Sequence, residues 1–112
     1  MSKGADALRA VVEKIFPNQI IELEHNVADR GSLFIDIYLP ALSIGFEYDG
    51  EQHFKYIEHF HGDRRGFANS RKRDLSKDDA CVAKDITLVR VAYNEPMDHD
   101  SILKKIEDAL DG

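Results

Sequence analysis

The segment Phe34–His53, FIDIYLPALSIGFEYDGEQH, decides the fold, because its hydrophobic pattern predicts two strands joined by a tight turn. Successive side chains of a strand point to opposite faces, so alternate residues share a face. In the first strand one face collects Leu33, Ile35, Ile37 and Leu39. In the second strand one face collects Ile44, Phe46 and Tyr48, and the other collects Ser43, Gly45, Glu47 and Asp49.

The turn sets which residues of the two strands lie opposite each other. A two-residue loop of Ala41 and Leu42, or a four-residue loop with the same centre, places Asp36 directly across from Glu47. Their Cβ atoms would then lie roughly 4.5–5.5 Å apart, which is unfavourable for like charges unless a positive group lies between them. Asp49 shares the face of Glu47, so three carboxylates converge. They indicate a divalent-cation site, and the alternative is a solvated face with acids by chance.

Length and composition predict one soluble globular domain, residues 1–112, because 43% of the residues are hydrophobic and 32% are charged. No apolar run approaches the roughly 18 residues of a membrane span, and no signal peptide opens the chain. We therefore expect no membrane partner. The single Cys81 excludes an internal disulfide and a cysteine-based zinc site, which favours a reducing, cytoplasmic location.

Charge is distributed unevenly along a chain whose formal net charge is −6. Residues 55–77 contain seven basic side chains against three acidic ones. The basic ones are Lys55, Arg64, Arg65, Arg71, Lys72, Arg73 and Lys77. A basic segment beside an acidic metal-like site suits phosphodiester chemistry and predicts DNA as a partner. The alternative is an ordinary solvated helix and loop.

The remaining elements are read from periodicity and from turn residues. We expect helices over residues 2–16 and 67–84, strands over 19–26 and 86–93, and a last helix that Asp100 or Ser101 caps. The apolar face of that last helix would be Ile102, Leu103, Ile106 and Leu110. The order is αβββαβα, which predicts an α/β fold, more narrowly α+β, with helices on both sides of a central mixed sheet.

Two further features have a structural and a functional interpretation. Residues 54–66 read as an aromatic, basic loop that either contacts nucleic acid or packs on the body of the domain. Asp74, on a half-apolar helix face, is either an inward-pointing carboxylate or the partner of Arg71 or Lys77 in an ordinary ion pair.

The chain resembles the very-short-patch mismatch repair endonucleases in four motifs that occur in the same order: FIDIYLP, IGFEYDGEQHF, SRKRD and ITLVRVAY. They are more similar still to the phage-type homing endonucleases of the same fold. Both groups belong to the PD-(D/E)XK nuclease class, and the resemblance covers nearly the whole chain. It implies a restriction-endonuclease-like fold and the EDxHD variant of the active site: a helix-one Glu, a strand Asp, a His after a glycine-bearing turn and a helix Asp.

The resemblance also implies residue roles. Asp36 would be the central ligand of Mg²⁺ or Mn²⁺, with Glu47 as the second acidic ligand and the carbonyl of Tyr48 as a third oxygen. Asp49 stands where the wider class keeps a lysine. His53 would transfer the proton, and Asp74 would complete the site by orienting His53 or holding a metal-bound water.

One departure from the family pattern lies in the first helix. Ala5 stands where the family has its helix-one carboxylate, and Asp6, Glu13 and Glu22 are the other acids that could replace it. The sequence thus predicts a metal-dependent DNA endonuclease that nicks one strand per site. The alternatives are a DNA-binding module that has lost catalysis and a protein-interaction domain with an acidic face. Sequence selectivity would come from a homodimer or a separate DNA-recognition domain.

Overall fold

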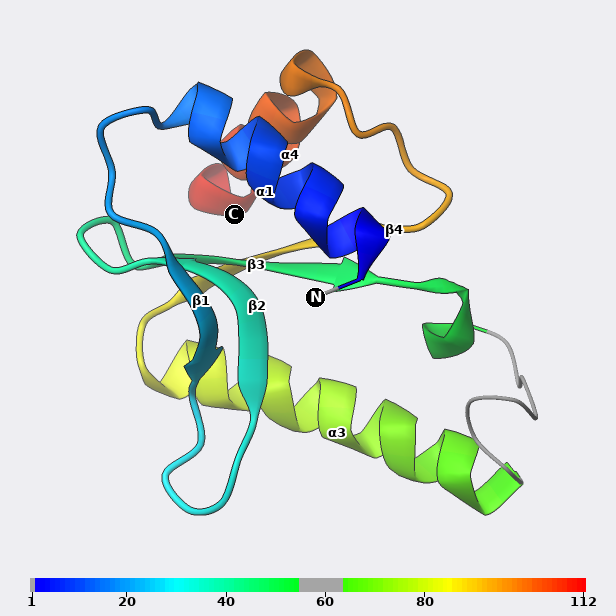
Figure 1. Ribbon diagram of the computed structural model, residues 1–112. Helices are drawn as coiled ribbons and strands as arrows, with labels where there is room; N and C mark the ends of the chain where they lie inside the picture. Colours follow the sequence, from blue (N-terminus) through cyan, green and yellow to red (C-terminus); the bar gives the residue numbers. More distant parts are fainter. Residues whose placement is uncertain (1, 55–63) are drawn as a thin grey trace.

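The computed structural model describes residues 2–54 and 64–112 and contains four strands and three α-helices in that part of the chain (Figure 1). In chain order the elements are α1 (Lys3–Ile15), β1 (Glu22–Asn26), β2 (Phe34–Leu39), β3 (Ile44–Asp49), the 3-10 helix η1 (Glu51–His53), α3 (Arg64–Ala83), β4 (Thr87–Ala92) and α4 (His99–Asp111). This order confirms the predicted αβββαβα arrangement. No helix in the described ranges is long and apolar enough to cross a membrane.

The sheet is mixed and has the order β1-β2-β3-β4. β1, β2 and β3 pair antiparallel as a meander, and β4 pairs parallel to β3. A parallel pair requires a long crossover connection, and α3 supplies it. Figure 1 shows α1 and α4 on one side of the sheet and α3 on the other, which confirms the predicted α+β class. The edge where β3 ends therefore has one face turned toward α3.

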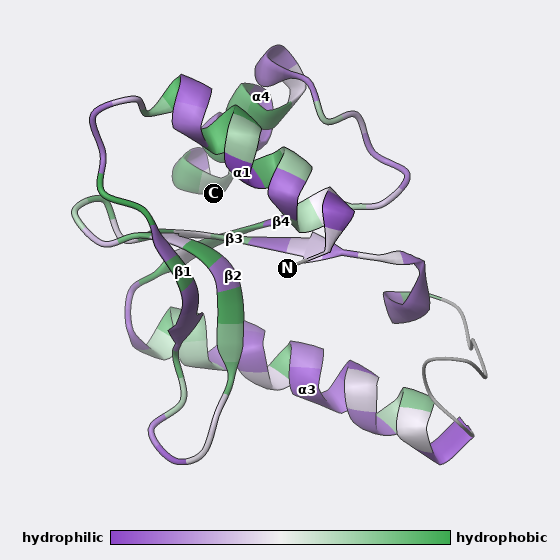
Figure 2. Cartoon of the chain, in the orientation of Figure 1, coloured by the Kyte–Doolittle hydropathy of each residue, from purple (hydrophilic) through white to green (hydrophobic). Residues whose placement is uncertain are grey.

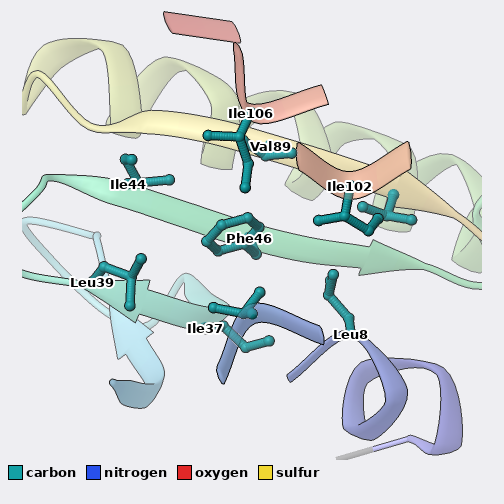
Figure 3. Close-up of a cluster of buried hydrophobic side chains, with 10 residues drawn as sticks. Leu8, Ile37, Leu39, Ile44, Phe46, Val89, Ile102 and Ile106 are labelled. Carbon is teal, nitrogen blue, oxygen red and sulfur yellow. The ribbon is translucent and has the colours of Figure 1, made fainter. Parts of the chain in front are cut away.

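The main hydrophobic core lies between the sheet and the helices α1 and α4. Its buried members are Leu8, Val12, Ile37, Leu39, Ile44, Phe46, Val89, Val91, Ile102 and Ile106. Figure 3 shows the ring of Phe46 among the side chains of the strands and of both helices. In Figure 2 the hydrophobic green colour marks parts of α1, α4 and the strands, as expected for amphipathic elements packed face to face.

A second cluster lies on the α3 side and consists of Val27, Ile35, Cys81 and Ile86. Ile35 had been expected to share the core face of Ile37, and that expectation was wrong. The strand ribbon twists and bends where β2 separates from β3, as Figure 1 shows, so strict alternation does not hold along its whole length.

The predicted register of the central hairpin is confirmed. Leu39 pairs with Ile44 and Ile37 pairs with Phe46, around a four-residue turn at positions 40–43. Extending the same register by one residue places Asp36 opposite Glu47. The hairpin therefore delivers two acidic side chains to the point where the β2–β3 pairing ends.

The helix ends differ in part from the sequence predictions. Ser2 caps α1 as expected, because its Oγ accepts a hydrogen bond from the Ala5 N–H at 3.1 Å. At α4 the cap is Asp98, whose carboxylate accepts from the Ser101 N–H, so the prediction of Asp100 or Ser101 was wrong. Leu110 is 56% exposed and lies outside the core. Ala109 packs against the core in its place.

The crossover helix α3 begins at Arg64, three residues before the predicted start. Gly66 had been taken as a loop residue, but a glycine costs a helix only about 1 kcal/mol relative to alanine. Arg64 and Arg65 therefore lie on a helix instead of in a loop. Lys55 and the aromatic residues of the expected loop up to position 63 lie outside the described residues.

Candidate active site

The first feature of the site is the pair of carboxylates on β2 and β3. The backbone N–H of Asp36 donates to Glu47 Oε1 at 3.2 Å, and the N–H of Tyr48 donates to Asp36 Oδ2 at 2.8 Å. Each acid thus accepts from the backbone of the neighbouring strand where the regular ladder has ended. The two side chains converge on one point, as the register predicted.

Glu47 is buried and electrostatically frustrated. Only 3% of its surface is exposed. Burial, together with the adjacent charge of Asp36, raises the pKa of Glu47 to about 7. The ammonium of Lys77 on α3 partly offsets this, since its Nζ lies 2.7 Å from Glu47 Oε2. Either a proton on Glu47 or a further positive charge beside the pair therefore relieves the repulsion that Lys77 leaves.

The chemistry of this pair fits a divalent cation. Carboxylate oxygens are hard ligands, and Mg²⁺ is commonly held by one or two carboxylates, with waters and substrate phosphates completing its shell. The Lys77 ammonium lies against Glu47 and marks where positive charge is favourable. Within residues 2–54 and 64–112 no group of three or more His, Cys, Asp or Glu side chains is arranged to hold a metal. Asp36 and Glu47 are thus the candidate protein ligands, with Tyr48 adjacent through its backbone.

Asp49 takes a different role from the one expected for a third converging acid. It lies on the same face of β3 as Glu47, but its Oδ1 accepts from Arg90 Nη1 at 2.8 Å. Burial raises the pKa of Asp49, and the charge of Arg90 works against that rise. The prediction of three convergent carboxylates is therefore corrected to two, with Asp49 bound to an arginine.

The second feature of the site joins η1 to α3. His53 Nδ1 lies 2.7 Å from Asp74 Oδ2, and Asp49 Oδ1 lies 3.8 Å from the same nitrogen. The hydrogen bond with Asp74 raises the pKa of His53, although burial opposes the rise. Burial alone would raise the pKa of Asp74, but the bond to His53 lowers it overall. The predicted inward direction of Asp74 is confirmed, and its partner is His53.

Arg90 joins these groups and was not predicted as a site residue. Its guanidinium donates to Asp49, to Asp78 Oδ1 at 2.9 Å and to the carbonyl of Asp74 at 3.1 Å. It thereby fixes α3 against β3 and β4. The only sequence signal is a charged residue within the largely apolar segment ITLVRVAY.

A cavity of about 160 Å³ opens beside the His53–Asp74 pair. Its lining is Asp49, His53, Phe54, Arg71, Asp74, Leu75, Asp78 and Arg90. Arg71 reaches over this space, and its Nη1 donates to the carbonyl of His53 at 3.0 Å. At about 30 Å³ for each water molecule, the cavity has room for about five waters or for a group of similar size.

The predicted basic residues fall into two sets. Arg64, Arg65, Arg71, Lys72 and Arg73 are exposed along the first half of α3. Lys77 instead lies inside the site with 15% of its side chain exposed, bound to Glu47. It is therefore not an exposed phosphate ligand as expected.

The region of the missing helix-one carboxylate is apolar. Ala5 is 2% exposed and belongs to the core. The other acids that could replace it lie elsewhere: Asp6 is exposed, Glu13 pairs with Arg9 at 2.8 Å, and Glu22 pairs with His25 at 3.0 Å.

Comparison with known proteins finds relatives in viruses. The chain is 31% identical over 110 residues to the uncharacterized protein 094L of Frog virus 3, a match that covers 94% of this chain and 70% of that protein. It is 44% identical over 62 residues to the uncharacterized protein 307L of Invertebrate iridescent virus 6, covering 55% of the chain and 32% of that protein. A match to the uncharacterized protein 033L of Invertebrate iridescent virus 3 has 30% identity and covers 40% of that protein. The chain thus spans less than half the length of proteins 307L and 033L. No family model and no solved structure matches.

Proposed function

The chain belongs to the same family as protein 094L of Frog virus 3, and we propose that it is a metal-dependent DNA endonuclease that nicks one strand per site. One observation carries this proposal. A carboxylate pair, half-buried Asp36 and buried Glu47, and a hydrogen-bonded His53–Asp74 pair lie on the side of the sheet that α3 covers.

Asp36 and Glu47 are the residues that would hold Mg²⁺ or Mn²⁺, with the Tyr48 carbonyl as a further oxygen. When bound, such an ion supplies charge neutralisation at a phosphate oxygen and acidifies water. The raised pKa of Glu47 supports this assignment. Positive charge brought to the pair relieves the repulsion that burial and Asp36 create.

His53 is the proposed proton acceptor. With Nδ1–H donated to Asp74, the neutral imidazole leaves Nε2 as the basic nitrogen. Asp74 fixes the tautomer and the ring orientation, and it stabilises the imidazolium that forms when His53 takes a proton from the attacking water. Because the pKa of His53 is raised, the neutral form that accepts the proton becomes dominant at a higher pH than for an ordinary histidine.

Two cations complete the proposed site. Lys77, on α3, pairs with Glu47 and partly neutralises its charge. It thereby brings a lysine to the carboxylate pair. In the wider nuclease class the lysine is on the strand, at the position where β3 carries Asp49. Arg71 is held over the cavity by the His53 carbonyl and would bind a phosphate oxygen there.

The test is nicking of supercoiled plasmid in Mg²⁺ or Mn²⁺. We expect the parent chain to convert plasmid to the open circle. We expect His53→Ala to be slower by about 100-fold or more, the usual range for loss of a general base. Asp36→Asn should also be strongly slowed, because it removes a proposed ligand of the metal. Asp100→Asn, an exposed acid on α4, is the matched control and should behave as the parent. Equal nicking by all four preparations would indicate a contaminating nuclease and would contradict the proposal.

A second candidate is a DNA-binding module without catalysis. The observation that favours it is Ala5, buried in the position where the nucleases that this sequence resembles place a carboxylate. In that case neither metal would support nicking, and binding to DNA would persist and weaken with salt.

A further inference from the structure

The helix α3 has two contrasting faces. Residues at spacings of four, three and four, namely Ser70, Asp74, Lys77 and Cys81, are half-buried or buried and face the sheet. The opposite face, by the same helical spacing, carries Arg65, Asn69, Lys72 and Ser76, and all four are exposed. One face of α3 therefore builds the site, and the other is a polar surface directed away from the domain.

This outward surface is strongly basic. Positions 64–73 carry five basic side chains and no acidic one, in a chain whose formal net charge is −6. On the helix flanks, Arg71 and Arg73 are also exposed. Figure 2 shows hydrophilic purple along much of α3 and at its beginning. Beside this polar face α3 also exposes Leu75 and Val82, both in its second half, whereas the first half carries the basic residues.

We infer that the first half of α3 lies in the major groove of duplex DNA, with Arg65, Asn69 and Lys72 directed at base edges. Arg73 and Arg71, on the flanks, would contact the phosphates of the two groove walls. A major groove about 12 Å wide admits an α-helix. Arg and Lys pair with guanine and Asn with adenine in that groove. This inference rests on the proposed function, since it names how that site meets its substrate.

The position of the surface relative to the site supports the same geometry. The basic segment leads directly into Asp74 and Lys77 on the same helix. Ten helical residues span about 15 Å, so the groove-facing residues lie within about half a turn of duplex from the reacting phosphate. A helix in the groove would therefore fix which phosphate reaches His53.

The experiment measures binding without cleavage. A labelled duplex of about two helical turns is titrated in EDTA and followed by fluorescence anisotropy. We expect Arg65→Gln and Lys72→Gln each to weaken binding about tenfold, the effect of losing one good base contact. Lys104→Gln, an exposed lysine on α4 across the sheet from α3, is the matched control and should bind as the parent.

Two further readouts separate groove binding from general attraction. Arg73→Gln should reduce the slope of log affinity against log salt by about 0.9, whereas Asn69→Ala should change sequence preference and leave the slope unchanged. Methylation of guanine N7, which lies in the major groove, should interfere with binding. Equal losses for Lys104→Gln and Lys72→Gln, or full binding to N7-methylated duplex, would overturn the inference.

The outcomes distinguish this inference from the proposed function. Plasmid nicking with unchanged affinity in the α3 variants would refute the groove geometry and leave the endonuclease proposal standing. Binding through α3 with no nicking in either metal would refute the endonuclease and leave the groove geometry standing.

Discussion

Replacing Glu47 with glutamine tests the electrostatics of the carboxylate pair through the stability of the fold. In the parent chain, burial and the charge of Asp36 raise the pKa of Glu47 from 4.5 to about 7. Between these two pH values the folded protein holds a proton that the unfolded chain has lost. The free energy of unfolding contributed by Glu47 must therefore fall as the pH rises through this window, and then stay level above it.

The magnitude follows from the width of the window. Each unit of difference between the folded and unfolded pKa changes the free energy of unfolding by about 1.4 kcal/mol. Ionised Glu47 therefore destabilises the folded state by about 3 kcal/mol at pH values above 7. Glu47→Gln removes this titration. The ion pair with Lys77 exists only while Glu47 is ionised, so its contribution is already contained in the pKa of about 7 and is lost together with the titration.

The assay is urea unfolding of the parent and Glu47→Gln at about pH 4 and about pH 8, in EDTA. We expect the stability difference between them to move by about 3 kcal/mol in favour of the variant on going from the lower to the higher pH. Glu107→Gln, an exposed acid on α4, is the matched control and should show no such change. A difference that is the same at both pH values would refute the reasoning about Glu47.

Two other predictions concern the groups around His53. The nicking rate should rise with pH through a midpoint above 6.5, because His53 must be neutral to accept a proton and its pKa is raised by Asp74. In Asp74→Asn the midpoint of the rate profile should move to lower pH. A midpoint that does not move would contradict the pairing of His53 with Asp74. Arg90→Met should destabilise the fold by about 3 kcal/mol, because it leaves buried Asp49 without its partner. Lys104→Met, an exposed control, should change stability by less than about 1 kcal/mol, and equal effects of the two in thermal unfolding would contradict a structural role for Arg90.

The sequence was most informative where local rules determine the geometry. The period-two alternation around positions 40–43 fixed the register, and the register alone placed Asp36 opposite Glu47. The contact between His53 and Asp74 was one of the two roles that the family resemblance implied for Asp74, and the helical spacing of α3 indicated only that this carboxylate points inward.

The remaining parts of the site depend on tertiary packing. Lys77 meets Glu47 because α3 lies against the sheet, and Arg90 meets Asp49 because β4 pairs parallel to β3. No local pattern encodes either position. The same is true of Ile35, which packs under α3 because the ribbon bends. The start of α3 was predicted three residues too late for a different reason. The glycine at position 66 was taken as a loop signal, although a helix can accommodate one glycine at a small cost.

Titration of Mn²⁺ into the protein at about pH 8, where Glu47 is ionised, tests the central claim most directly. Electron paramagnetic resonance measures the free ion. The carboxylate pair predicts one bound ion per chain in the parent and in Asp100→Asn, and loss of that ion in Asp36→Asn and Glu47→Gln. A parent chain that leaves Mn²⁺ free at millimolar concentration, or acid variants that bind it as the parent does, would contradict a cation site between β2 and β3.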